Sequence, residues 1–257
     1  MENTVLITGG AGYIGRAIAD EFCKNSSNLI LIDQNKNNLI KIQKALIKKY
    51  QNSIDIYDCD MSDPKKLKDL CVFINSKYKK IDTIVNSIGM VGTDHMIGWN
   101  EDFDNQGKDA WQKCLDTNLT SIFFLVQNLH KNMIKSKNPS IINISSIYGV
   151  CPPDWDLYEG TEIKNPGAYS VSKAGLIHMT KWLASTLAPR IRVNCVSPGG
   201  IRRKQSSAFI KKYESKTLLK RMATEKDIVG PVIFLSSPSA SYITGINLIV
   251  DGGWTLK

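Results

Sequence analysis

The stretch T-V-L-I-T-G-G-A-G-Y-I-G, residues 4–15, allows the fold to be predicted. Its first part, Val5–Thr8, predicts a short strand that is buried on both faces. The glycine-rich turn Gly9–Gly15 comes next and leads into a helical pattern with Ile14, Ile18 and Phe22 along one side. Glycines spaced G-x-x-G-x-x-G let the backbone turn tightly and approach a pyrophosphate group, whose charge is stabilised at a helix N-terminus. The stretch therefore predicts a dinucleotide-binding strand–turn–helix unit.

Strand-like and helix-like segments alternate over the rest of the chain, without a linker or a change of composition. The further predicted strands are Leu29–Ile32, Ile54–Tyr57, Ile81–Val85, Ile141–Ile144, Arg192–Val196 and Asn247–Val250. This alternation predicts an α/β protein with a doubly wound parallel sheet of the Rossmann type and helices on both faces. We expect a single domain over residues 1–257, with nucleotide binding in its N-terminal half and catalysis and substrate binding in its C-terminal half.

The composition is that of a globular protein, with 42% apolar and 22% charged residues among 257. No apolar run approaches the roughly 18 residues of a membrane span, and no signal peptide precedes the first strand, so we expect a cytoplasmic protein that does not bind a membrane. The cysteines lack C-x-x-C pairs and a neighbouring histidine cluster, which favours free thiols in a reducing compartment and predicts no metal site. They are Cys23, Cys59, Cys71, Cys114, Cys151 and Cys195.

The formal net charge of +9 could indicate binding to nucleic acid or attraction of phosphorylated substrates. The lysines are nevertheless spread along the whole chain, mostly at helix positions predicted to be exposed. This spread favours a solvated surface and no nucleic-acid partner. One local excess stands out, because residues 202–226 include nine basic and two acidic residues.

Two acidic residues follow predicted strands at the edge of the sheet where a dinucleotide would bind. Asp33, at the end of the second strand, can hydrogen-bond both hydroxyls of an adenosine ribose. It would repel a 2′-phosphate at a cost of several kcal/mol, which favours NAD over NADP as the cofactor. Asp60 and Met61 follow the third strand, where the edge of an adenine could be recognised. Asp60 alone could instead belong to the cap region of the next helix, which is predicted to start at 62–64.

The stretch A-Y-S-V-S-K, residues 168–173, places a phenol and an ammonium four residues apart, at Tyr169 and Lys173. On a helix this spacing puts both side chains on one face. A nearby cation lowers the pKa of a phenol from its usual value of about 10, which makes the phenol useful for proton transfer near neutral pH. Taken alone, the pair is more typical of a solvated helix face. Asn118 is a further candidate, because an asparagine inside a helical run is unfavourable without a reason.

The motifs of the chain occur in a recognisable order. They are the glycine turn, N-S-I-G at 86–89, the Asn118 helix, N-I-S-S at 143–146, Y-S-V-S-K, S-P-G-G-I at 197–201 and T-G-I-N-L-I-V-D-G-G at 244–253. In this order they resemble those of short-chain dehydrogenases/reductases over essentially the whole chain. The resemblance implies a catalytic tetrad, in which Tyr169 is the acid–base residue and Lys173 lowers its pKa and holds the nicotinamide ribose. Ser146 would hydrogen-bond the reacting oxygen, and Asn118 would order a water chain that relays the proton.

The implied cofactor contacts lie in the glycine turn, at strand ends and on the Tyr169 helix. They are Gly9, Gly12, Tyr13, Ile14, Gly15, Asp33, Asp60, Met61, Asn86, Gly89, Tyr169, Lys173, Pro198, Gly199 and Ile201. Ser145 is an alternative to Ser146 for the tetrad serine, but the spacing to Gly149 favours Ser146. The family also implies a homodimer or homotetramer built on the helices that carry Asn118 and Tyr169.

Several features depart from the family pattern. Tyr13 stands where the shorter subfamily keeps a glycine, and Arg203 stands where a threonine is usual after S-P-G-G-I. The loop at 90–106 and the segment at 151–167 are long and contain carboxylates, tryptophan and tyrosine, which suit a hydroxyl-rich ligand. We expect the segment at 151–167 to grip substrate hydroxyls and to face Arg202 and Arg203, which would bind a phosphate of the substrate.

The segment that begins I-Y-G-V-x-x-P at 147–153 and continues x-L-Y-E-G at 156–160 also resembles bacterial oxidoreductases of flagellin modification and surface-sugar (legionaminate-type) biosynthesis. We therefore expect an NAD-dependent oxidoreductase that interconverts a secondary alcohol and a ketone on a carbohydrate, a sugar phosphate or a nucleotide sugar. One alternative is a 3-oxoacyl carrier-protein reductase whose basic stretch at 202–226 docks an acidic carrier. Another is a dinucleotide-sensing or nucleic-acid-binding protein that has lost catalysis.

Overall fold

Seven parallel strands form one sheet in the computed structural model of the protein, which describes residues 3–91, 95–161 and 164–256. The strands are β1 (Thr4–Thr8), β2 (Asn28–Asp33), β3 (Ile54–Asp58), β4 (Thr83–Asn86), β5 (Ser140–Ile144), β6 (Arg192–Pro198) and β7 (Asn247–Val250). Their order in the sheet is β3-β2-β1-β4-β5-β6-β7, so the chain reverses its direction of winding between β1 and β4. The predicted doubly wound α/β sheet is thereby confirmed.

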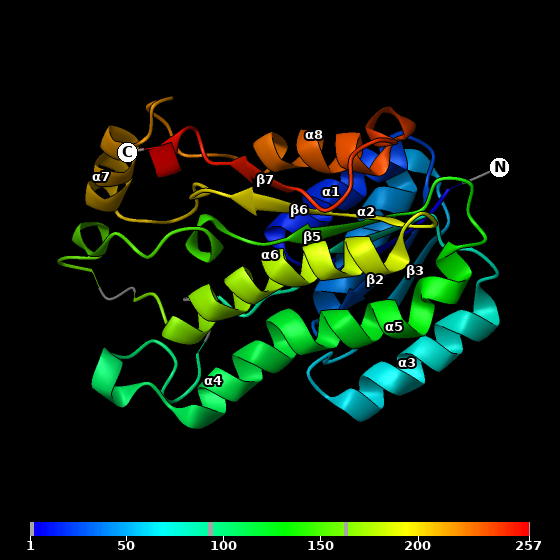
Figure 1. Cartoon of the computed structure of the whole chain (residues 1–257), viewed down its shortest axis with the longest axis horizontal. Coiled ribbons are helices and arrows are strands. Elements are labelled where there is room, and N and C mark those ends of the chain that lie inside the picture. Colours follow the sequence, from blue (N-terminus) through cyan, green and yellow to red (C-terminus); the bar gives the residue numbers. More distant parts are fainter. Residues whose placement is uncertain (1–2, 92–94, 162–163, 257) are drawn as a thin grey trace.

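Both faces of the sheet are covered by helices, because the strands are apolar on both sides. The helices α1 (Tyr13–Lys24), α2 (Lys36–Tyr50) and α8 (Glu225–Ser236) pack on one face, and α3 (Pro64–Lys77), α5 (Ser121–Met133) and α6 (Gly167–Leu187) pack on the other (Figure 1). Successive β1 residues alternate between the two layers. Val5 and Ile7 join the cluster of α1 and α8, whereas Leu6 joins that of α3 and α5.

The segments that follow the carboxyl ends of the strands build the site. Helix α4 (Lys108–Leu115) continues through a π-helical turn, Asp116–Thr120, into α5. Helix α7 (Ser207–Lys216), the short turn Trp155–Leu157 and the C-terminal turn Trp254–Leu256 lie at the same end of the molecule, to the left in Figure 1.

The structure differs from one predicted strand boundary and agrees with the predicted state of the cysteines. The strand predicted at Ile81–Val85 begins later, at Thr83, because the N–H of Ile81 donates to the Asn132 carbonyl on α5 rather than to a strand. The six cysteines are free thiols, as predicted, and all but the half-buried Cys151 are buried. Within the described ranges, no helix has both the length and the apolarity to cross a membrane, and no group of three His, Cys, Asp or Glu side chains could hold a metal ion.

Candidate active site

The glycine-rich turn between β1 and α1 has its shape because Gly9 and Gly15 lack side chains. Gly9 adopts φ +67°, and a Cβ there would lie 2.7 Å from the Ser87 carbonyl oxygen. A Cβ on Gly15 would lie 2.1 Å from the Gly9 carbonyl oxygen. The N–H of Gly12 donates to that same oxygen at 3.0 Å and closes the turn. Because α1 begins at the next residue, its first N–H groups point toward the space beside the turn, where a phosphate would be stabilised.

A cleft of about 410 Å³ opens beside this turn, between the ends of β2, β3 and β4. The predicted cofactor residues that line it are Gly9, Gly12, Asp33, Asp60, Met61 and Gly89. Further lining residues, which we did not predict, include Ser87, His95, Lys113 and Thr117. A bare glycine cradle at one end and carboxylates at the other fit the pyrophosphate and the adenosine of a dinucleotide.

Asp33 links the end of β2 to the glycine turn by a hydrogen bond. Its Oδ2 accepts a hydrogen bond from the Ala11 N–H in the glycine turn at 3.1 Å, and its Oδ1 accepts one from the Asn35 N–H at 2.9 Å. The carboxylate is thus fixed at the tip of β2, facing the space where an adenosine ribose would lie.

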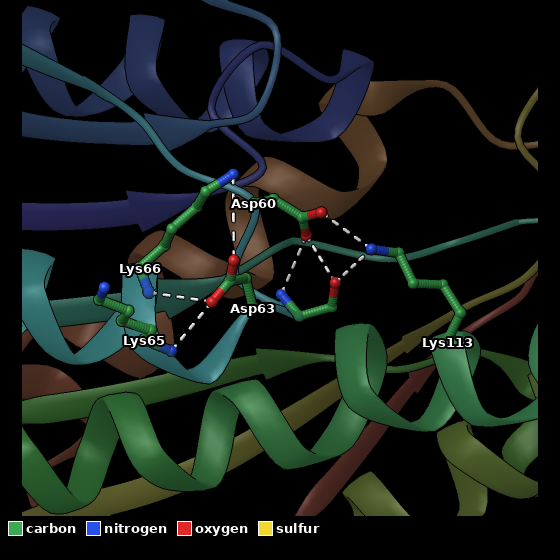
Figure 2. Close-up of polar contacts among 6 residues, drawn as sticks. Asp60, Asp63, Lys65, Lys66 and Lys113 are labelled. Atoms are coloured by element: carbon green, nitrogen blue, oxygen red, sulfur yellow. Dashed lines mark hydrogen bonds and ion pairs between the residues drawn. The ribbon is translucent and has the colours of Figure 1, made fainter.

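Asp60 is held by a lysine that the sequence did not single out. Lys113, from α4, places its Nζ 2.8 Å from Asp60 Oδ2 and also contacts the Ser62 hydroxyl (Figure 2). The Ser62 N–H and O–H donate to Asp60 Oδ1 at 3.1 and 2.6 Å. Burial opposes ionisation of Asp60, but these hydrogen bonds and the charge of Lys113 outweigh it and lower the pKa of the carboxyl group. The helix cap that we considered for Asp60 is provided by Asp63, which accepts from the N–H groups of Lys65 and Lys66.

Other predicted cofactor residues lie outside the residues that line this cleft. Asn86 is fully buried, and its Nδ2 donates to Asn143 Oδ1 on β5 at 2.8 Å. Asn86 therefore links two strands of the sheet, whereas the residues that follow it, 87–89, line the cleft. Ile14 packs into the core under α1, and Tyr13, the first residue of that helix, is half exposed. Pro198, Gly199 and Ile201 stand at the carboxyl end of β6, where the Gly199 N–H donates to the Val250 carbonyl of β7 at 2.9 Å.

Tyr169 and Lys173 lie on one face of α6, as their spacing predicts. Lys173 Nζ is 5.8 Å from the centre of the Tyr169 ring and donates to the Ile144 carbonyl at the end of β5 at 3.0 Å. A Cβ on Gly89 would lie 3.2 Å from Lys173 Nζ. The ammonium therefore stands between the catalytic helix and the cleft.

The pKa values of this pair differ from the simple expectation. Burial raises the pKa of Tyr169 to about 12, although its hydrogen bond with Ser146 acts in the opposite direction. Burial also lowers the pKa of Lys173 to about 8. The protein's own residues therefore do not lower the phenol pKa, because burial disfavours the charged phenolate. A positively charged nicotinamide ring bound beside Tyr169 would act in the direction required.

The two adjacent serines have different partners, which separates the two candidates. Ser146 hydrogen-bonds the Tyr169 side chain and accepts from the Tyr148 N–H at 3.2 Å. Ser145 donates instead to the Lys173 carbonyl at 2.8 Å and anchors α6 to the end of β5. Only Ser146 is thus in contact with the phenol.

Asn118 is completely buried in the π-helical turn between α4 and α5. Its Oδ1 accepts from the Met90 N–H at 2.6 Å, and its Nδ2 donates to the Met90 carbonyl at 3.2 Å and to the Ser172 hydroxyl at 3.0 Å. The asparagine that is unfavourable in a helix interior therefore ties the backbone after β4 to the catalytic helix. π-Helical turns often occur at functional sites.

Among the described residues, the carboxylates of the long segment after Gly149 form their ion pairs with α7 and not with Arg202 or Arg203. Its carboxylates pair with lysines of α7: Lys216 contacts Asp154 and lies 3.7 Å from Asp156, and Lys212 lies 3.7 Å from Glu159. Glu162 is outside the described residues. Arg203 instead ion-pairs with Glu225 of α8 at 2.8 Å, and Arg202 is exposed. Sequence spacing could not show these pairings, because the three lysine–carboxylate contacts join segments that are far apart in the chain.

The same segment approaches the catalytic tyrosine with aromatic side chains. The Tyr158 hydroxyl lies 2.6 Å from that of Tyr148 and hydrogen-bonds the buried Asn165. Tyr158 is also close enough to Tyr169 to contribute to the raised pKa of that residue. These hydroxyl and amide groups are suited to hydrogen-bond a polar substrate.

Comparisons with known proteins show the family to which the chain belongs. A family model described as enoyl-(acyl carrier protein) reductase matches residues 9–255. The crystal structure of a short chain dehydrogenase from Leptospira borgpetersenii with bound NAD+ is 33% identical, with a TM-score of 0.84 over 99% of this chain and 93% of that one. The chain is a short-chain dehydrogenase/reductase.

This short-chain dehydrogenase/reductase has full-length relatives of two kinds. It is 33% identical over 259 residues to post-translational flagellin modification protein A of Campylobacter coli, and the match covers 100% of both chains. It is 31% identical to the 3-oxoacyl-(acyl-carrier-protein) reductase FabG of Thermotoga maritima, over 96% of each. The protein is therefore an oxidoreductase that uses a nicotinamide dinucleotide.

Proposed function

We propose that this enzyme interconverts a secondary alcohol and a ketone on a carbohydrate, a sugar phosphate or a nucleotide sugar in surface-glycan biosynthesis, with NAD as its cofactor. The observation that carries the chemistry is that Ser146 and Lys173 both lie beside the Tyr169 phenol: Ser146 acts to lower the phenol pKa, and the Lys173 ammonium lies 5.8 Å from the centre of the ring. The sugar assignment is supported by full-length similarity to a protein named for flagellin modification. The hydroxyl and amide groups of Tyr158 and Asn165 near Tyr169 also favour a hydroxyl-rich substrate.

The residues divide the work of proton transfer at the substrate oxygen. When bound, the nicotinamide exchanges a hydride with the substrate carbon. Tyr169 donates a proton to the oxygen during ketone reduction and accepts it back during oxidation, while the Ser146 hydroxyl hydrogen-bonds the same oxygen. Lys173 favours the phenolate by its charge, and Asn118 holds the Met90 backbone and the Ser172 side chain of α6 in place. Positioned acid–base catalysis of this kind contributes about 10²–10⁴ in rate.

A substrate screen tests this proposal. The purified protein is incubated with NAD or NADH, and NADH absorbance is followed over sugars, sugar phosphates and nucleotide sugars. We expect turnover with at least one of them, which is lost in Tyr169→Phe. Turnover that is confined to 3-oxoacyl thioesters would contradict the sugar assignment.

The 3-oxoacyl carrier-protein reductase remains the second candidate, because relatives of that name match nearly the whole chain. Its docking surface would be the basic stretch at 202–226. Four of the nine basic residues there already pair with carboxylates, namely Arg203, Lys212, Lys216 and Arg221. This pairing reduces the positive charge available to an acidic carrier and favours the sugar substrate.

We also propose that the enzyme is a homodimer or homotetramer that associates through α5 and α6. A shallow groove of about 450 Å³ on this face is lined by Phe123, Met179 and Trp182, among others. Trp182 is 50% exposed and Phe124 is 43% exposed. Exposed aromatic side chains on adjacent helices are typical of protein interfaces. Light scattering should give a mass of two or four chains, and Trp182→Glu should shift it toward one.

A further inference from the structure

Tyr13 and Arg203, the two residues that depart most clearly from the family pattern, contact each other. The guanidinium carbon of Arg203 lies 4.4 Å from the centre of the Tyr13 ring, and that of Arg16 lies 4.6 Å from the same ring. Both distances are in the range of cation–π contacts. Tyr13 therefore gathers two positive charges at the first turn of α1, directly after the glycine cradle.

Arg203 is fixed in this position from several sides. The loop that carries it is bound to a second segment, because Ile201 bridges Ala223 and the Arg202 N–H donates to the Ala223 carbonyl at 2.8 Å. Arg203 Nη1 lies 2.8 Å from Glu225 Oε1 and donates to the Arg202 carbonyl at 3.0 Å. In the part of the chain that the structure describes, Nη2 and Nε of Arg203 donate no hydrogen bond. The guanidinium is thus held in place with two donor nitrogens available to a ligand.

We propose that Arg203 binds the pyrophosphate of the dinucleotide and that Tyr13 orients the Arg203 side chain. This inference rests on the proposed function only for the position of the cofactor site. A dinucleotide places two negative charges at the N-terminus of α1, and Tyr13 is the first residue of that helix. A planar guanidinium can donate two parallel hydrogen bonds to phosphate oxygens. The Arg203 side chain reaches from the loop after β6 to the first residue of α1, where its guanidinium carbon lies over the Tyr13 ring. This assignment replaces the substrate-phosphate role expected for Arg203 from the sequence.

The role of Tyr13 follows from the same contact. An arginine on a loop loses conformational freedom when it binds a ligand, and a side chain that already holds it reduces that loss. The Tyr13 ring supports one face of the guanidinium, and Glu225 supports one edge. Tyr13 is therefore a positioning residue, which acts on the cofactor through Arg203.

Calorimetric titration with three probes tests the proposal. NADH and ADP-ribose both contain the pyrophosphate, whereas adenosine lacks it. Loss of a charge-assisted hydrogen bond should make Arg203→Ala bind NADH and ADP-ribose about ten- to a hundredfold more weakly, with adenosine affinity unchanged. The difference should shrink at high salt. Arg202→Ala, at the exposed neighbouring position, is the matched control and should bind all three probes as the wild type does.

Two further variants test the positioning role. Tyr13→Phe keeps the ring and should retain wild-type affinity for ADP-ribose, whereas Tyr13→Gly should reproduce part of the loss seen in Arg203→Ala. Melting temperatures establish that each variant is folded. Unchanged ADP-ribose affinity in Arg203→Ala, or an equal loss for adenosine, would overturn the proposal. Because ADP-ribose lacks the nicotinamide and no turnover is measured, a failed sugar screen would refute the proposed function without affecting this result.

Discussion

The carboxylate of Asp33 is hydrogen-bonded to the glycine turn, with Oδ2 3.1 Å from the Ala11 nitrogen. Asp58 occupies the paired position at the end of β3, but it is exposed and ion-pairs with Lys36 at 3.6 Å. Of these two matched carboxylates, Asp33 is the one that lines the cleft. Its charge stands where an adenosine 2′-phosphate would have to enter, and it thus supports our proposal of NAD rather than NADP.

We predict that Asp33→Ser reduces the preference for NAD(H) over NADP(H) by about tenfold or more, because a like-charge repulsion is removed. Calorimetric titration with both dinucleotides measures the ratio. Asp58→Asn is the control, and its ratio should equal that of the wild type. A wild-type protein that binds NADP(H) as tightly as NAD(H) would contradict the argument.

Tyr169→Phe should lower turnover by at least about a hundredfold and leave NADH affinity within about twofold, because only the proton-transferring hydroxyl is removed. Turnover is measured on a substrate found in the screen, and affinity by titration. Tyr242→Phe, at a fully exposed phenol, should leave both unchanged. Wild-type turnover in Tyr169→Phe would show that the acid–base residue is elsewhere.

Substitution of Ser146 should affect mainly turnover, whereas substitution of Ser145 should affect mainly stability. Ser146→Ala removes the hydroxyl that bonds Tyr169 and should reduce turnover about ten- to a hundredfold with little change in melting temperature. Ser145→Ala removes the bond to the Lys173 carbonyl and should cost about 1 kcal/mol of stability with a smaller loss of turnover. The reverse pattern would assign the catalytic role to Ser145.

Much of the fold could be predicted because local patterns determine it. The buried β1 strand, the glycine turn and the period of α1 depend on neighbouring residues alone, and the strand at Asn247–Val250 was predicted with its observed bounds. The spacing of Tyr169 and Lys173 fixed their common face in the same way. Contacts between distant segments could not be predicted from spacing. Lys113 reaches Asp60 across 53 positions, and Lys216 reaches Asp154 across 62.

The pKa of Tyr169 illustrates a second limit. The sequence shows that a cation is near the phenol, but it does not show how deeply both groups are buried. Burial raises the pKa of Tyr169 and lowers that of Lys173, so desolvation works against the ionised form of each. A sequence can thus identify a catalytic pair without giving its electrostatics.

The buried ammonium of Lys173 should lower stability in a pH-dependent way. Its pKa is about 8 in the folded chain and 10.5 in its reference state, so between these values the unfolded chain binds more protons and stability rises with pH. Below about pH 8 both states are protonated and the full cost of burial is present. Lys173→Met removes this cost, about 3 kcal/mol, but also loses the bond to the Ile144 carbonyl, about 1 kcal/mol.

We therefore predict that Lys173→Met is about 1–2 kcal/mol more stable than the wild type at pH 7, that this gain shrinks toward pH 9.5, and that the variant is inactive and binds NADH more weakly. Denaturant unfolding at several pH values measures the gain. Lys181→Met, at an exposed position on the same helix, should show no such pH-dependent gain. The assignment would be contradicted if Lys173→Met were less stable than the wild type at pH 7 and if its stability relative to the wild type were the same at pH 7 and pH 9.5.

The ion pairs of Lys216 should control substrate affinity rather than cofactor affinity. Lys216 joins α7 to Asp154 and Asp156, and Leu157 packs with Phe209 of α7 in one apolar cluster. Since the segment also brings Tyr158 close to Tyr169, loosening it should disturb the substrate side of the site. Partly exposed pairs contribute about 0.2–1 kcal/mol each, so Lys216→Met should raise the substrate KM about two- to fivefold and leave NADH affinity unchanged.

Exchanging the charges of Asp154 and Lys216 tests whether their ion pair itself controls the substrate KM. Asp154→Lys alone should raise KM at least as much as Lys216→Met, because it places two cations together. The double variant Asp154→Lys, Lys216→Asp restores opposite charges and should recover most of the wild-type KM. Lys211→Met, at an exposed position on α7, should leave KM unchanged. If both single variants lower the melting temperature while KM stays at the wild-type value, the pairs stabilise the fold and have no part in substrate binding.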